Sequence, residues 1–295
     1  MSNMYAIRTT NLTKYYGKSR GIVDLNLAVK KGEFFGFIGP NGAGKSTCIR
    51  TLLGLIKCSS GSATVLGLDI QQDKTEILKR VGYMPSETMF YTGMRVKDVL
   101  KLSADLRGMD CTEEAKVLCD RLQLDVNKKV EELSFGNKKK VSIVCALQHK
   151  PELLILDEPT SGLDPLMQRE FFQILRERNA EGTTIFLSSH ILAEVQRNCT
   201  RAGIIREGRL IACDSVESLS QTNAKRVHVQ GNVKIEELGQ VRDLRQTENG
   251  LTFLYGGEIK QLLEVLSKQP IQDLSISEPD LEEIFMHYYV DGGEA

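Results

Sequence analysis

The residues with the most obvious chemistry form a glycine-rich loop, GPNGAGKST, at residues 39–47. Its glycines allow successive backbone N–H groups to surround phosphate oxygens, and a helix beginning at Lys45 would point its positive end at the same anion. Lys45 is placed to reach the β- and γ-phosphates, and the Ser46 hydroxyl to hold Mg²⁺. An apolar strand before the loop and an apolar helix after it favour a nucleotide site over a purely structural turn. The loop residues assigned to the nucleotide are Gly39, Pro40, Asn41, Gly42, Ala43, Gly44, Lys45, Ser46 and Thr47.

Two adjacent carboxylates, Asp157 and Glu158, follow the apolar run LLIL at residues 153–156. Buried strands of an open α/β sheet end at its ligand edge, so these carboxylates should lie beside the phosphate loop. Asp157 is then the natural outer-sphere partner of the Mg²⁺ held by Ser46. Glu158 can orient the water that attacks the γ-phosphate, or accept its proton. A solvated strand end is the alternative, and the flanking sequence disfavours it.

A third apolar segment, TTIFLSS at residues 183–189, leads to His190. A lone histidine is more often a structural hydrogen-bonding group than a catalytic one. Here it follows another predicted core strand, where its imidazole could contact the γ-phosphate. Lys45, Glu158 and His190 are therefore the candidate catalytic residues.

Hydrophobic periodicity predicts the elements that carry these residues. The three apolar strands, each followed by chemistry-bearing residues, indicate an α/β nucleotide-binding domain at residues 1–215. Within it, apolar residues recur at helical spacing in 96–108 and 112–124. They predict an inserted helical subdomain at about residues 89–150.

The last eighty or so residues differ from the rest. A polar joint, SQTNAK at residues 220–225, marks a domain boundary near Ser215. Beyond it the segments RVHVQG, LTFLYGG and IQDLSIS have the pattern of strands, and IKQLLEVLSK and PDLEEIFMHYY that of helices. These segments predict a small C-terminal α+β domain at residues 216–295 without a visible catalytic cluster. The MHYY run at residues 286–289 is interpreted as core packing rather than as a ligand site.

Composition limits what the 295-residue chain can be. Hydrophobic residues make up 41% and charged residues 26%, as in an ordinary folded soluble protein. A net charge of -1 gives no overall field to gather nucleic acid, so no nucleic-acid partner is expected. The apolar runs are shorter than the roughly 20 residues that span a bilayer, and the N-terminus lacks the apolar core of a signal peptide, which together predict a cytoplasmic location. The seven scattered cysteines are expected to be reduced and structural.

The motifs, taken in order, resemble the nucleotide-binding subunit of ATP-binding cassette (ABC) transporters from Met4 to about Ser215. GPNGAGKST matches Walker A, LSFGNKKKV the signature, LLILDE Walker B, SGLD the D-loop and SSH the switch histidine. The resemblance implies a P-loop NTPase fold of the ABC-cassette type, with ATP and Mg²⁺ as cofactors. It also implies that the inserted helical subdomain faces a membrane partner.

The resemblance also assigns residues outside these loops. Tyr16 aligns with the aromatic side chain that stacks on adenine, and the alternative is a strand aromatic packed in the core. In the family two cassettes close head to tail, so Ser134 and Gly136 would bind the γ-phosphate of the ATP held by a second cassette. The lysines at residues 138–140 begin the helix that follows, and a solvated helix face is an equally acceptable interpretation of at least two of them.

Departures from the family pattern are also visible. In the Q-loop, Ser86 stands where a glutamine usually contacts magnesium and hinges toward the membrane subunit, and Glu87 follows it. Ser86 could act through a water, or Glu87 could take part. In the signature, Phe135 and Asn137 replace the more usual glycine and glutamine, while the flanking Ser134 and Gly136 are intact.

The sequence predicts an ATPase subunit of a membrane exporter, held at the inner face of the cell membrane by separate transmembrane permease subunits. The SEPDLEEIFMHYY segment at residues 277–289 resembles an ending common in the bacterial drug- and peptide-exporter branch. The second cassette could be an identical copy or a paralogue. The alternative is a soluble ABC-type ATPase that remodels a nucleic-acid or protein complex. A regulatory nucleotide sensor is disfavoured because Glu158 and His190 are both present.

Overall fold

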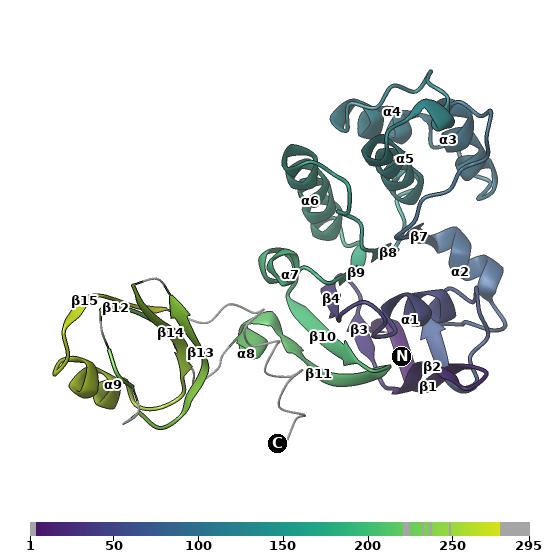
Figure 1. The fold of residues 1–295 in the computed structure, drawn as a ribbon. Helices are drawn as coiled ribbons and strands as arrows, with labels where there is room; N and C mark the ends of the chain where they lie inside the picture. Colours follow the sequence, from purple (N-terminus) through teal and green to yellow (C-terminus); the bar gives the residue numbers. More distant parts are fainter. Residues whose placement is uncertain (1–3, 221–224, 232, 236–237, 248, 278–295) are drawn as a thin grey trace. The chain divides into compact units, whose positions relative to one another are not determined.

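The chain divides into two compact units, Met1–Val216 and Glu217–Ala295, next to the boundary predicted near Ser215 (Figure 1). The computed structural model describes residues 4–220, 225–231, 233–235, 238–247 and 249–277. The first unit contains the phosphate loop, both carboxylates and His190, so the candidate site belongs to this unit alone.

The first unit is built on a six-stranded sheet with the order β11-β10-β4-β9-β8-β7. All neighbours in it run parallel except the antiparallel pair β10 and β11. Every residue of β4, β8 and β9 is buried, which explains why these strands are nearly continuous apolar runs. The strands are β4 (Phe34–Ile38), β7 (Val81–Met84), β8 (Leu153–Asp157), β9 (Thr184–Ser189), β10 (Arg201–Arg206) and β11 (Arg209–Ser215).

A second, antiparallel sheet has the order β2-β1-β5-β6, with β3 also paired to β1. Its long strand β1 alternates buried and exposed residues from Ile7 to Thr10, as expected when one face meets a core. The strands are β1 (Tyr5–Tyr16), β2 (Ser19–Leu25), β3 (Ala28–Lys30), β5 (Ser60–Val65) and β6 (Leu68–Asp69).

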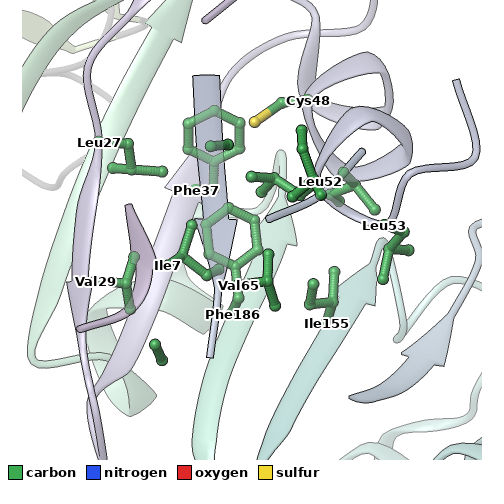
Figure 2. Packing of buried hydrophobic residues seen from close by; sticks show 14 of the residues in the cluster. Ile7, Leu27, Val29, Phe37, Cys48, Leu52, Leu53, Val65, Ile155 and Phe186 are labelled. Carbon is green, nitrogen blue, oxygen red and sulfur yellow. The ribbon is translucent and has the colours of Figure 1, made fainter. Parts of the chain in front are cut away.

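One hydrophobic core joins the two sheets to the helix that follows the phosphate loop, α1 (Lys45–Leu52). Figure 2 shows Phe37 and Phe186 packed ring to ring, with Cys48 of α1 beside Phe37. The ring centroids of Phe37 and Phe186 are 5.3 Å apart, and those of Phe35 and Phe186 are 5.8 Å apart. Because Phe37 and Phe186 come from β4 and β9, this packing fixes the two strands that carry the phosphate loop and His190.

Along the chain, the inserted helices come after β7 and before β8 (Figure 1). These two strands are hydrogen-bonded neighbours in the sheet. Ser134 caps α5, and α5 packs against α3 and α4. The helices of this insertion are α3 (Val96–Asp105), α4 (Thr112–Arg121), η1 (Val130–Glu132) and α5 (Phe135–Leu147). The remaining helices of the first unit are α2 (Lys74–Arg80), α6 (Pro165–Ala180) and α7 (Leu192–Asn198), and α8 (Val216–Ser220) follows β11. The α/β fold class predicted from the sequence is confirmed, including the inserted helices.

The second unit has an antiparallel sheet, β13-β14-β12-β15, and an amphipathic helix. Its core contains Phe253 and Tyr255 of the sheet and Leu262 and Leu266 of the helix. The elements are β12 (Lys225–Gly231), β13 (Val241–Thr247), β14 (Gly250–Tyr255), α9 (Ile259–Leu266) and β15 (Ile271–Ser277). The sequence had not predicted β13, whose residues beyond Val241 are all exposed, so it carries no apolar pattern. The helix predicted over PDLEEIFMHYY and the MHYY run lie outside the described residues.

All seven cysteines are free thiols, in agreement with the prediction. Burial raises the pKa of the Cys48 thiol to about 12, with a smaller contribution from Asp157, so this side chain stays a neutral core residue. Within the described ranges, no helix is long and apolar enough to cross a membrane.

We expect Phe186→Ala to lower the free energy of unfolding by about 3–5 kcal/mol, because it removes the ring that joins β4 and β9 and leaves a cavity. Chemical unfolding followed by circular dichroism measures this change. Leu166→Ala on α6 is the control, since Leu166 is exposed, and it should change stability by about 0.5 kcal/mol or less. A Phe186→Ala effect as small as that of the control would contradict this account of the core.

Candidate active site

The phosphate loop connects buried strand β4 to α1 through glycines in the left-handed region. Gly44, the residue before α1, has φ 108°, and a Cβ there would lie 2.5 Å from the Gly21 carbonyl oxygen. Gly42 has φ 80°. Side chains at these positions would be strained, so the glycines are what allows the chain to turn here. The first turn of α1 has no acidic residue, which leaves its positive end available to an anion.

Lys45, the first residue of α1, is 5% exposed and reaches back over the loop. Its Nζ donates to the carbonyl oxygens of Gly39 at 2.6 Å and Pro40 at 3.2 Å. The same Nζ lies 3.2 Å from Glu158 Oε1. Among the described residues, two backbone carbonyl oxygens accept hydrogen bonds from the ammonium group, and the contact with Glu158 Oε1 is an ion pair without hydrogen-bonding geometry.

Asp157 ends β8 and is almost fully buried. Its Oδ1 accepts a hydrogen bond from Ser188 Oγ at 3.1 Å. Burial raises the pKa of the Asp157 carboxyl, and the hydroxyls of Ser46 and Ser188 and the charge of Lys45 oppose that rise. Among the described residues, no donor meets hydrogen-bonding geometry at the other oxygen, Oδ2, although Ser46 is close enough to influence the carboxyl. A buried carboxylate oxygen without a partner, next to a hydroxyl, fits a divalent cation such as Mg²⁺.

Glu158 follows Asp157 and joins Lys45 to His190. Its Oε2 lies 2.5 Å from His190 Nδ1, while Oε1 faces Lys45. The backbone of Glu158 has φ 51°, in the left-handed region that a glutamate seldom adopts. Such conformations cost on the order of 1–3 kcal/mol and persist only where the surroundings impose them. The Glu158 N–H donates to the Ser188 carbonyl oxygen at 3.0 Å, which is one such restraint.

The sheet order explains why residues from three motifs meet. Since β9 lies between β4 and β8 and all three run parallel, the phosphate loop, Glu158 and His190 follow strands that end at the same edge. The carboxylates therefore lie beside the phosphate loop, as the sequence predicted from strand polarity. The sequence analysis had not named Ser188, which bonds to both carboxylate residues from the end of β9.

Tyr16 lies at the end of β1 with 47% of its surface exposed, so it is not a buried core aromatic. A Cβ added to Gly21 would come within 3.2 Å of Tyr16 Cε2 and within 2.7 Å of Thr47 Cγ2. The Tyr16 ring and the first turn of α1 therefore approach the same backbone position. Stacking of adenine on Tyr16 stays a prediction.

The signature residues form the beginning of α5. Ser134 is its exposed N-cap, and its Oγ accepts from the Asn137 N–H at 3.4 Å. Phe135 packs against Gly162 of the D-loop, since a Cβ on Gly162 would lie 2.2 Å from Phe135 Cδ1. Gly136 is partly buried. Binding of a second cassette's ATP by Ser134 and Gly136 stays a prediction.

One residue that the sequence analysis left unassigned is Lys139, which is fully buried. The solvated-face interpretation, made for at least two of the three lysines, does not extend to this residue, while Lys138 and Lys140 are partly exposed. Lys139 lies on the buried face of α5 with Ser142, Ile143 and Ala146. Spacings of three, four and seven residues are those of one helix face, and this signal could have located Lys139 from the sequence.

The first unit thus has the fold and the site of a P-loop nucleoside triphosphatase. Residues 22–161 match the protein family described as ABC transporter. The chain is 37% identical to the bacitracin transport ATP-binding protein BcrA of Bacillus licheniformis, over 95% of this chain and 96% of that protein. It is 30% identical to the linearmycin resistance ATP-binding protein LnrL of Bacillus subtilis (strain 168), over 95% and 97%.

Among solved structures, an ATP binding subunit of an ABC transporter matches with a TM-score of 0.69 and 30% identity, over 72% of this chain and 91% of that one. The chain belongs to the ABC transporter family. ATP-binding subunits of this family hydrolyse ATP and work together with transmembrane subunits. The family resemblance read from the motifs is confirmed.

We expect Lys45→Ala to weaken ATP binding by roughly 10- to 100-fold, because it removes a charge-assisted contact to phosphate. Calorimetric titration with ATP measures the affinity. Lys116→Ala, at an exposed position on α4, is the control and should bind ATP as the unchanged chain does. Unchanged affinity in Lys45→Ala would contradict the assignment of this loop to the nucleotide.

Proposed function

We propose that this chain is the ATPase subunit of a bacterial-type drug or peptide exporter. The observation that carries the proposal is the contact of Lys45, Glu158 and His190 at one sheet edge. Two relatives that match this chain over almost their full length are named for bacitracin transport and linearmycin resistance. The cargo class follows from those names, and the chemistry follows from the site.

In the proposed reaction Glu158 orients the attacking water and accepts its proton, and His190 holds the carboxylate through Nδ1. Lys45 stabilises charge on the β- and γ-phosphates. Ser46 and Asp157 would hold Mg²⁺, which when bound neutralises phosphate charge. Binding of phosphate by Lys45 would break its contact with Glu158 and leave one carboxylate oxygen free to receive the water proton.

A second cassette, identical or paralogous, would bind the same ATP from the opposite side. Ser134 is exposed at the beginning of α5, and the first turn of that helix carries no acidic residue. An exposed hydroxyl at the positive end of a helix suits a phosphate oxygen. We propose that Ser134 and Gly136 bind the γ-phosphate on the partner cassette, so that each site is complete only when two cassettes close.

Exposed apolar side chains support a transmembrane partner. Met89 is 90% exposed and Tyr91 76% exposed, in the loop between β7 and α3. Leu106 and Met109, just after α3, are exposed as well. Large exposed apolar side chains mark interaction sites. We propose that the part of the insertion surface on which Met89, Tyr91, Leu106 and Met109 are exposed binds the permease subunits and holds the chain at the inner face of the membrane.

Glu158→Gln should retain ATP binding and slow hydrolysis by roughly 10²-fold or more, the scale of a lost general base. Glutamine keeps the size of the side chain but cannot accept a proton. Phosphate release measured at saturating ATP reports the rate, and calorimetry reports the affinity. Hydrolysis near the unchanged rate would remove Glu158 from this role.

Replacement of both Met89 and Tyr91 by serine should abolish copurification with the permease. The permease is expected in a neighbouring reading frame as a protein with several apolar spans. Affinity purification of the tagged chain from membranes measures the association. Leu166→Ser, at another exposed apolar position, should leave it intact. If the double variant still copurifies, or if the unchanged chain brings no multi-span protein from membranes, the transporter assignment of this surface fails.

A further inference from the structure

Lys139 is 0% exposed, yet its ammonium group has no carboxylate as a direct hydrogen-bond partner among the described residues. Its Nζ donates to the Ser86 carbonyl oxygen at 2.6 Å, and longer contacts of 3.5 Å and 3.4 Å reach the carbonyl oxygens of Pro85 and Glu158. Three acceptors match the three protons of an ammonium group. The direct hydrogen-bond partners of this buried charge are therefore backbone carbonyl oxygens.

These contacts join three segments that are distant in the sequence. Lys139 belongs to α5, the helix of the signature. Pro85 and Ser86 follow β7 in the Q-loop, which leads to the exposed Met89 and Tyr91. Glu158 is the proposed general base. One side chain thus connects the signature helix, the loop leading to the permease surface and the backbone of Glu158.

Burying the charged ammonium group of a lysine at this position costs desolvation free energy. Burial lowers the pKa of the Lys139 ammonium, and Asp157 and Glu158 oppose that change. An apolar side chain of similar volume would avoid the desolvation cost. It would also leave three carbonyl oxygens without a donor, including that of Glu158. The lysine is therefore matched to the acceptors that converge on it.

The contact with Glu158 matters because of the backbone conformation there. The left-handed φ of 51° requires restraint from the surroundings. The Glu158 N–H is restrained by the Ser188 carbonyl oxygen, and the Glu158 carbonyl oxygen is contacted by Lys139. The two restraints act on both sides of the residue, one from β9 and one from α5.

We propose that Lys139 is a positioning residue for ATP hydrolysis, which fixes the Glu158 backbone and ties it to the Q-loop at Ser86. The proposal rests on the proposed function of Glu158 as general base. In this chain the Q-loop carries Ser86, whose side chain is shorter than the usual glutamine and extends less far from the backbone. The Lys139 ammonium supplies the connection instead, through the backbone of the loop. Phe135, whose ring centroid lies 5.9 Å from Nζ, covers the lysine toward the D-loop.

The test is Lys139→Met, which keeps an unbranched side chain one atom shorter and removes the three donors. We expect kcat for ATP hydrolysis to fall roughly 10- to 100-fold, as a misplaced catalytic group does, while affinity for a non-hydrolysable ATP analogue stays within about threefold. Lys139→Gln keeps two N–H donors and should retain more of kcat than Lys139→Met. Lys116→Met, on exposed α4, is the matched control and should keep the unchanged kcat.

Three outcomes overturn the proposal. The first is a kcat for Lys139→Met within about twofold of the control. The second is an equal loss of nucleotide affinity and kcat, which indicates general damage to the fold. The third is a Lys139→Gln variant no better than Lys139→Met.

Glu158→Gln, assayed beside these variants, separates this proposal from the proposed function. If Glu158→Gln is inactive and Lys139→Met is active, only the role of Lys139 fails. If the unchanged chain with its permease does not hydrolyse ATP, the proposed function fails.

Discussion

The parallel alignment of β4, β9 and β8 is the constraint on which the rest of the site depends. Each strand ends at the same edge, where Glu158 and His190 follow β8 and β9 directly and Lys45 follows β4 after the phosphate loop. The packing of Phe37 and Phe186 in the core holds β4 and β9 in register. The ends of β8 and β9 therefore position Glu158 and His190, while the phosphate loop and α1 position Lys45, as pre-organised catalysis requires.

Four ionisable groups with little or no exposure to solvent surround this edge. Lys45 and Lys139 are cations, and Asp157 and Glu158 are carboxylates. Each cation is held mainly by carbonyl oxygens, so neither neutralises a carboxylate completely. Asp157 keeps an oxygen without a hydrogen-bond donor in the described part of the chain. Such a partly compensated cluster is suited to bind a cation and a polyphosphate, whose charges would complete the balance.

The same unit presents two surfaces that suit other chains. The beginning of α5 offers Ser134 at the positive end of a helix, and the loop before α3 offers Met89 and Tyr91. Ser86 precedes Met89 in the same loop, and its carbonyl oxygen is bound by Lys139 of α5. Lys139, which orients Glu158, would therefore be part of any physical connection between closure of the two cassettes and binding of the permease.

The sequence by itself determined the elements and most of the chemistry of the site. The glycine loop, the apolar strands before Asp157 and His190 and the helical spacings of the insertion depend on local geometry, which a sequence displays directly. It did not reveal β13, whose exposed residues carry no apolar pattern, or the environment of Lys139. Helical spacing could place Lys139 on the buried face of α5, but only the tertiary structure decided that carbonyl oxygens surround its ammonium group and that Glu158 adopts a left-handed backbone. Both depend on α5, β7 and β8 meeting in space, and residues 53, 54 and 19 positions apart in the chain come into contact there.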